Sequence, residues 1–144
     1  MLHIASGASR APRIARALFA CAVLSLAACS SSAEPAPPPV LTPGATRVTT
    51  SSDVVLELTS SPIQLGKNDL GVTLLTPGAE LVTVSALMPA HGHGTRPPIV
   101  ERDAQTGKYA VRDLILYMSG RWEVRLEVSS GGTRDDALVV VDVP

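Results

Sequence analysis

The sequence predicts an all-β fold, a single β-sandwich of about seven short strands. From residue 53 onward, apolar and polar residues alternate with a period of two over several segments, which is typical of strands with one buried face. Glycine, proline and asparagine separate these segments, as expected of turns. After Cys29 no stretch repeats its apolar residues at helical spacing. We therefore expect residues 47–144 to form one β domain, since about a hundred residues suit a single core.

The first 28 residues predict a signal peptide. Residues 1–16 carry Arg10, Arg13 and Arg16 and no carboxylate, and residues 17–28 form an uncharged run that is apolar apart from Ser25. A basic segment followed by a short apolar one is typical of secretory signals. The run is shorter than the roughly 20 apolar residues that span a membrane as a helix. We expect this segment to be cleaved from the mature protein.

Cys29 is expected to carry a lipid. Leu26-Ala27-Ala28-Cys29 resembles the lipobox of bacterial lipoproteins, with a branched residue and two small residues before the cysteine. The resemblance implies cleavage before Cys29 and a diacylglycerol thioether on its sulfur. The alternative is an ordinary signal peptide cut near Ala28, with Cys29 unmodified. Ser30 follows, and by resemblance to Gram-negative sorting rules its presence favours the outer membrane. We expect an envelope protein that is lipid-anchored and faces the periplasm.

Residues 29–46 predict a disordered tether. After Cys29 the segment is rich in serine, proline and alanine and has one charge, so it cannot bury a core. Three of the twelve basic residues belong to the signal peptide, which leaves nine against thirteen acidic residues. This mature chain has no basic tract to attract nucleic acid. Cys21 leaves with the signal peptide and Cys29 is lipidated, so a packed core rather than a disulfide must stabilise the domain.

Six segments are expected to form strands with apolar inward faces. These faces are Val54, Leu56 and Leu58 in residues 53–59; Leu70, Val72 and Leu74 in 69–75; Val82, Val84, Ala86 and Met88 in 80–88; Leu114, Leu116 and Met118 in 108–118; Trp122, Val124, Leu126 and Val128 in 121–128; and the nearly all-aliphatic segment 137–143, which suits burial on both faces. Six or seven short strands at this spacing indicate an immunoglobulin-like sandwich. Trp122 is expected to be the central large residue of its core.

The segment Met88-Pro-Ala-His-Gly-His-Gly94 is the part of the chain best suited to metal chemistry. His91 and His93 are the only histidines after the signal peptide, and an extended backbone would project both to the same side. Imidazole binds both oxidation states of copper, and the thioether of Met88 favours Cu(I). Met118, at the end of another predicted strand, can supply a second sulfur. The pattern predicts a copper site.

The same residues also have a purely structural interpretation. Met88 and Met118 fall in the inward register of their strands, where methionine commonly fills a core. His91 and His93 then serve only as polar residues of a turn. A His-x-His pair is by itself a weak motif, so both interpretations stay open.

A family resemblance rests on this loop and the residues that follow it. The matching residues are Met88, Pro89, His91, Gly92, His93, Gly94, Pro98, Val100, Gly107, Tyr109, Met118, Gly120 and Trp122. In type and order they resemble the YtkA-like family of bacterial extracytoplasmic β-sandwich domains, which is close to the FixH-like domains. The resemblance covers about residues 60–130. It implies a membrane-anchored sandwich, with a link to copper supply or respiratory-oxidase assembly.

Nothing in the sequence indicates catalysis. Both histidines share one Gly-rich loop, which is poor support for an oriented general base. Glu57, Glu123 and Glu127 are expected on outward faces, without the apolar surroundings that raise a carboxyl pKa. Asp135-Asp136 lacks the ligand spacing of a calcium loop and is expected at a solvated hairpin tip. We expect a protein that is not an enzyme.

Two functional hypotheses follow. In the first, the domain is a membrane-tethered copper-binding module that holds the ion through His91, His93, Met88 and Met118, and buffers it or passes it to a partner. In the second, it is a structural or protein-interaction module of the envelope that needs no metal. It would then present the loop or a strand edge to another protein.

Overall fold

The computed structural model describes residues 36–144, which form a β-sandwich of two antiparallel sheets. The predicted signal peptide, Cys29 and Ser30 lie outside the described residues. The strands are β1 Gly44–Thr49, β2 Val55–Ser60, β3 Gly66–Leu74, β4 Glu80–Met88, β5 His93–Gly94, β6 Ile99–Arg102, β7 Tyr109–Leu116, β8 Gly120–Ser130 and β9 Thr133–Val143. The predicted all-β sandwich is confirmed, with the short strands β1, β5 and β6 in addition to those expected. Residues 36–144 contain no helix that is long and apolar enough to cross a membrane.

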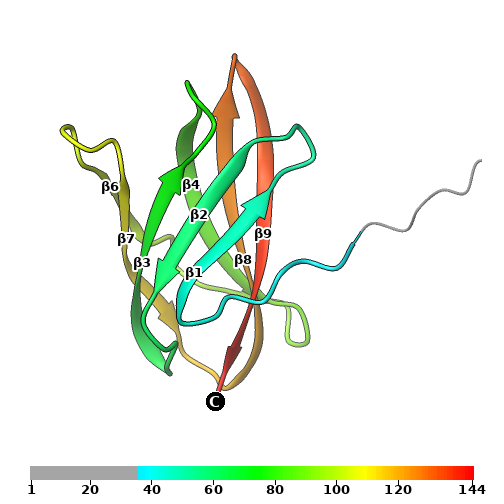
Figure 1. Ribbon diagram of the computed structural model, residues 1–144. Helices are drawn as coiled ribbons and strands as arrows, with labels where there is room; N and C mark the ends of the chain where they lie inside the picture. The colour runs from blue at the N-terminus through cyan, green and yellow to red at the C-terminus, as the bar shows by residue number, and fades with distance from the viewer. Residues whose placement is uncertain (1–35) are drawn as a thin grey trace, which may run out of the picture. The chain divides into compact units, whose positions relative to one another are not determined.

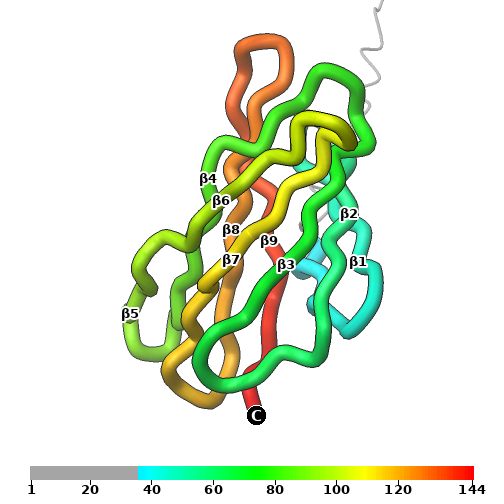
Figure 2. Tube along the Cα trace, turned by 90° about the vertical axis from the view of Figure 1, so that its left-hand side faces the viewer, coloured from blue at the N-terminus to red at the C-terminus, as the bar shows by residue number. Residues whose placement is uncertain are grey.

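The two sheets form two layers. One has the order β1-β2-β3-β7-β6 and the other the order β5-β4-β8-β9 (Figure 1). Figure 2 looks onto the first sheet, with β8 and β9 behind it. The chain changes sheets between β3 and β4, between β5 and β6, and between β7 and β8. The β7–β8 turn is therefore a connection between the sheets, whereas the β4–β5 loop joins two neighbouring strands of one sheet.

The core lies between the sheets and follows the predicted faces closely. Trp122 is fully buried, as are the next three inward residues of β8, and Leu56 and Leu58 of β2 face them across the sandwich interior. These residues alternate with exposed or half-exposed ones because successive side chains of a strand point to opposite faces. Residues 36–144 have a hydrophobic core of their own between the two sheets, as expected of a part of the chain that folds by itself.

A β-bulge in β4 overturns one predicted core residue. Leu81 is 7% exposed while Val82 is 39% exposed, the reverse of the expected alternation. The register with β8 shifts between Leu81 and Thr83, because Leu81 pairs with Val128 and Thr83 already pairs with Glu127. The extra residue of the bulge turns Val82 outward, and the alternation resumes at Val84. The prediction that Val82 faces the core was therefore wrong.

A second change of phase lies in β7. Tyr109 and Val111 are buried, and then Leu114 and Leu116. The alternation shifts at Asp113, which has a φ of 59°, a left-handed conformation that aspartate tolerates better than most residues. Leu114 and Leu116 confirm the predicted face. Met118 lies beyond the end of β7 and is half-buried against the core.

The sandwich begins earlier than the sequence predicted. Leu41 N donates a hydrogen bond to Val140 O (2.7 Å), and Val140 N donates one to Pro39 O (2.8 Å). These bonds place residues 39–41 parallel to β9, before β1 pairs with β2 in the other sheet. The tether boundary at residue 46 was therefore wrong. Val40 and Leu41 follow several prolines and show no alternation of apolar and polar residues, so the sequence does not predict a strand there. Their backbone pairing with β9 shows that they belong to the domain.

Leu41 and Val40 give a matched pair for testing this boundary. Leu41 is 6% exposed, whereas Val40 is 42% exposed. We expect Leu41→Ala to lower the free energy of unfolding of residues 36–144 by about 2 kcal/mol, the lower end of the range for a buried leucine. Val40→Ala should cost less than about 0.5 kcal/mol. Urea denaturation measures both. Equal losses would show that residues 39–41 do not pack on the sandwich in solution.

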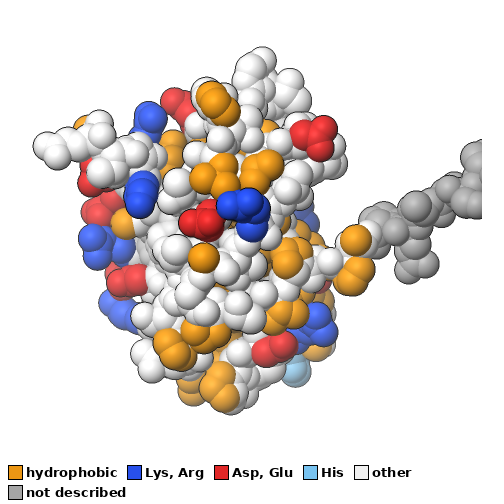
Figure 3. Space-filling view, viewed as in Figure 1, with side chains coloured by type: hydrophobic (Ala, Val, Ile, Leu, Met, Phe, Trp, Pro, Cys, Tyr) orange, Lys and Arg blue, Asp and Glu red, His pale blue; other side chains and the backbone are white. Residues whose placement is uncertain are grey.

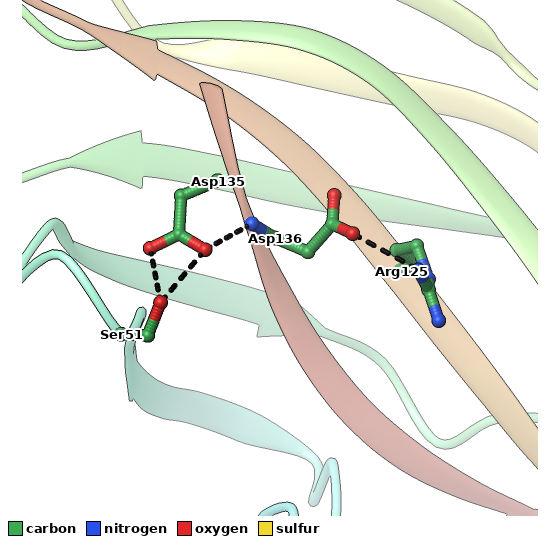
Figure 4. Close-up of polar contacts among 4 residues, drawn as sticks. All are labelled: Ser51, Arg125, Asp135 and Asp136. Atoms are coloured by element: carbon green, nitrogen blue, oxygen red, sulfur yellow. Dashed lines mark hydrogen bonds and ion pairs between the residues drawn. The ribbon is translucent and has the colours of Figure 1, made fainter. Parts of the chain in front are cut away.

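Asp135 fastens the β1–β2 turn to the start of β9 (Figure 4). Its carboxylate accepts hydrogen bonds from Ser51 Oγ (3.1 and 3.0 Å), Ser52 Oγ (2.7 Å) and Ser52 N (2.7 Å). The hydrogen bonds from Ser52, its side chain contributing most and its backbone N–H adding to it, hold the pKa of Asp135 well below its usual value. The prediction that Asp135 lies at a hairpin tip was therefore wrong. The tip lies at Gly131-Gly132, where both residues have positive φ.

The lowered pKa of Asp135 predicts a pH-dependent contribution to stability. A group with a depressed folded-state pKa stabilises the fold above its unfolded-state pKa of about 3.9, and this contribution is lost as the pH falls below that value. We expect Asp135→Asn to cost about 1 kcal/mol at pH 7, a figure kept low because the site is partly exposed. The difference from wild type should shrink below about pH 4.

The neighbouring Asp136 supplies the control for this measurement. It forms an exposed ion pair with Arg125 (2.9 Å) and makes no contact with the β1–β2 turn (Figure 4). Asp136→Asn should cost less than about 0.5 kcal/mol. Urea denaturation at several pH values follows both variants. A gap between wild type and Asp135→Asn that is unchanged from pH 7 to pH 3 would contradict the role given to Asp135.

Candidate functional site

The candidate loop is a tight turn between β4 and the short edge strand β5. His91 N donates a hydrogen bond to Met88 O (3.1 Å), and Gly92 N donates one to Pro89 O (3.3 Å). Gly92 has a φ of 63°, a conformation that glycine adopts without steric cost. Met88 then pairs with His93 across the hairpin. The backbone is therefore turned rather than extended between the two histidines, and only His93 lies on a strand.

Both histidine side chains are exposed, and their rings lie close together. The ring centroids are 6.1 Å apart and the ring planes make an angle of 52°. Histidine is also visible at the surface in the space-filling view (Figure 3). An imidazole bound to a metal has its ring centre roughly 3 Å from the ion, so two rings on one ion lie at most about 6 Å apart. The spacing of His91 and His93 is at this upper limit, so the separation of the rings is compatible with one ion between them.

Met88 lies on the inner side of the loop, within the core. Its side chain is 2% exposed. Its Cε atom lies 3.2 Å from the position that a Cβ at Gly120 would occupy. As a metal ligand, Met88 would have to leave the core, and an ion bound by the exposed imidazoles gains no sulfur from it in this conformation. Met118 is half-buried and packs against the same core from the β7–β8 turn.

The four predicted ligands thus fall into two groups. His91 and His93 come together at the surface, whereas both methionines serve the packing beneath. Within residues 36–144 no group of three or more histidine, cysteine, aspartate or glutamate side chains is arranged to hold a metal. Neither histidine takes part in any ion pair of that region. The described residues therefore offer a metal two accessible imidazoles, with further coordination positions left for water or for another molecule.

The Met118-x-Gly120-x-Trp122 pattern has a structural role at the β7–β8 turn. Trp122 Nε1 donates a hydrogen bond to Met118 O (2.9 Å), which satisfies the only polar group of a buried ring. Gly120 has a φ of 118°, and a side chain there would press on the Met88 methyl group. The pattern and Met88 therefore belong to one packing arrangement.

Tyr117 connects the loop to this turn, a role that the sequence analysis missed. Its hydroxyl donates a long hydrogen bond to Gly94 O (3.4 Å), and its ring packs edge-on against Trp122 at a centroid distance of 5.3 Å. Tyr117 thus holds the end of β5 against a residue of the core. An aromatic residue directly after the last inward position of β7 is the only sequence signal for this contact, and it does not identify the partner.

A surface hollow lies away from the loop, on the β6–β7 hairpin. It has a volume of about 650 Å³ and is lined mainly by charged residues, among them Glu101, Arg102, Lys108 and Arg112. Arg112 pairs with Glu101 (2.8 Å) and Arg102 with Glu80 (3.7 Å), so most of these charges are already compensated. The hollow contains neither histidine and contributes nothing to the candidate metal site.

Comparison of the chain with protein families, characterised proteins and solved structures finds no match.

Proposed function

We propose that this protein is a lipid-anchored envelope protein whose immunoglobulin-like sandwich binds copper through His91 and His93, for buffering or transfer. One observation carries the proposal: two exposed imidazoles of a single turn have ring centroids 6.1 Å apart. The resemblance of the loop to YtkA-like and FixH-like domains supports it independently. Met88 and Met118 have packing roles and are left out of the proposed ligand set.

The chemistry of this ligand pair suits a labile site. Imidazole binds copper in either oxidation state, and the mature chain has no thiolate that would hold the ion more firmly. Cu(I) accepts two nitrogen ligands in a near-linear arrangement, and the spacing of the two rings suits such an arrangement. An ion held at an exposed turn by two ligands is open to attack by ligands of another protein. Such a site favours transfer over storage.

The proposed lipid anchor on Cys29 is compatible with copper transfer between envelope proteins. A lipid on Cys29 would hold the domain at the periplasmic face of a membrane, and Ser30 favours the outer membrane. From Cys29 to Pro38 the Pro-rich segment reaches about 30 Å when fully extended. This reach would let the loop meet partners near the membrane surface. The partner in this proposal is an envelope protein that donates or accepts copper.

A competition titration tests the proposal. Residues 36–144 are titrated with Cu(I) against a chromophoric chelator, beside the double variant His91→Ala/His93→Ala. We expect sub-micromolar binding by wild type and a loss of at least about 100-fold in the double variant, since even groups that only support a ligand can cost this much. Arg96→Ala, an exposed change just after β5, is the control and should bind as wild type does. Equally weak binding by wild type and double variant would overturn the proposal.

A second candidate function is a docking module for an envelope protein. The observation that favours it is the open edge of β4. Short β5 pairs only with Leu87 and Met88, and no other strand of the described region covers the rest of that edge. Val82 and Leu87 are exposed apolar residues of the same strand. An extended segment of a partner could add to this edge through backbone hydrogen bonds. Absence of copper binding in the titration would favour this function.

A further inference from the structure

The proposed copper site leaves a divalent ion short of ligands. Zn(II) in structural sites takes four ligands, and Cu(II) prefers four nitrogen or oxygen ligands in a plane. One chain offers the two imidazoles of His91 and His93, and within residues 36–144 no third histidine, cysteine or carboxylate joins them. Two chains together offer four imidazoles, the complete set for such an ion.

The position of the pair allows two copies to approach each other. His93 lies on β5, which is the outermost strand of its sheet. One side of β5 pairs with Leu87 and Met88. No strand of the described region covers its other side, where the Tyr117 hydroxyl donates a hydrogen bond to Gly94 O. His91 is exposed in the turn directly before it. Two copies that approach through their β5 edges across a two-fold axis would bring their imidazole pairs near each other.

The contact between the protein copies is expected to be too small to hold without metal. β5 has only two residues, so an edge-to-edge contact adds very few backbone hydrogen bonds. The net stabilisation from so few bonds is far below the cost of association. Most of the binding energy must then come from the ion. If both copies carry lipid anchors in one membrane, their confinement raises the effective concentration at which they meet.

We propose that a divalent ion is shared by two copies of this protein, with His91 and His93 of each copy forming a four-imidazole site at facing β5 edges. This inference rests on the proposed function, because it uses the same two imidazoles. It adds a reversible, metal-dependent dimer. Binding of Cu(I) by a single copy and of a divalent ion by two copies would make the assembly depend on the oxidation state of copper.

Sedimentation velocity with Zn(II), which has no redox chemistry, tests the sharing. Residues 36–144 are run with zero, one-half and one equivalent of Zn(II), and bound metal is measured in the sedimenting species. We expect monomers without metal and dimers with one ion per two chains, returned to monomers by EDTA. His91→Ala and His93→Ala should each abolish the dimer, whereas Arg96→Ala should retain it. Circular dichroism confirms that each variant keeps the β-sheet spectrum.

The possible results of this experiment distinguish the shared-ion dimer from the metal-binding function on which it rests. One ion per chain on a monomer would overturn the shared site and leave the proposed metal-binding function standing. Dimers that persist in the two histidine variants would overturn the shared site, because association would not need the imidazoles. Absence of both Zn(II) binding here and Cu(I) binding in the titration would overturn the two proposals together.

Discussion

Trp122→Ala is expected to lower the free energy of unfolding by about 3–5 kcal/mol, the range for removing a large aromatic side chain from a core. Trp122 is fully buried at the centre of the sandwich, and Tyr117 packs edge-on against its ring. The substitution leaves a cavity between the sheets, removes that aromatic contact and leaves Met118 O without its donor. Urea denaturation of residues 36–144 followed by circular dichroism measures the loss.

Trp122→Phe separates the two contributions of the indole. It retains most of the buried apolar area but cannot donate a hydrogen bond to Met118 O. We expect a smaller loss, about 1–2 kcal/mol, from the missing hydrogen bond and the residual cavity. A loss below about 1 kcal/mol for Trp122→Ala would contradict the central position of this residue in the core.

The second large effect is expected at Met88, where stability and metal binding should separate. Met88 is 2% exposed, so Met88→Ala should cost about 3 kcal/mol, within the range for a buried methionine. Met88→Leu nearly conserves the side-chain volume and should cost less than about 1.5 kcal/mol. Because the sulfur lies in the core rather than beside the imidazoles, Met88→Leu should leave the Cu(I) affinity within about threefold of wild type.

Chemical denaturation and the chelator competition, applied to the same two variants, check this separation. Met88→Leu is the decisive variant because it removes the sulfur and keeps the core filled. A fall in Cu(I) affinity of tenfold or more in this variant, with stability retained, would show that Met88 leaves the core to bind the ion. The ligand set would then include the thioether, as the sequence pattern suggested.

The fold could be predicted wherever one face of a strand is buried without interruption. The alternation that begins at Trp122 predicts β8, because the polar and apolar side chains of this strand point to opposite faces. The bulge before Thr83 and the left-handed conformation of Asp113 each shift the alternation of buried and exposed residues by one position. The order of apolar and polar residues in the sequence does not reveal either shift. Leu41 was not predicted as a core residue, because it belongs to a short backbone pairing with β9 and not to a strand of alternating residues.

The candidate site was only partly accessible to sequence reasoning. The sequence identified His91 and His93 as a pair, and it also offered a core role for Met88 from its inward register. Whether a side chain at the end of a strand points into the core or toward a loop depends on what it meets across the sandwich. For Met88 that neighbour is Gly120, thirty-two positions later in the chain. The role of Tyr117 likewise depends on a neighbour, Gly94, from another connection.

X-ray absorption spectroscopy of residues 36–144 loaded with one equivalent of Cu(I) distinguishes the histidines from the methionines as ligands, because it identifies the atoms bound to the ion. We expect coordination by nitrogen at about 2 Å, with imidazole scattering from His91 and His93 and no sulfur near 2.3 Å. The same spectrum is expected for Met88→Leu. A sulfur contribution in wild type that disappears in Met88→Leu would overturn the proposed site, since it would place the copper at the buried methionine and not at the exposed pair of histidines.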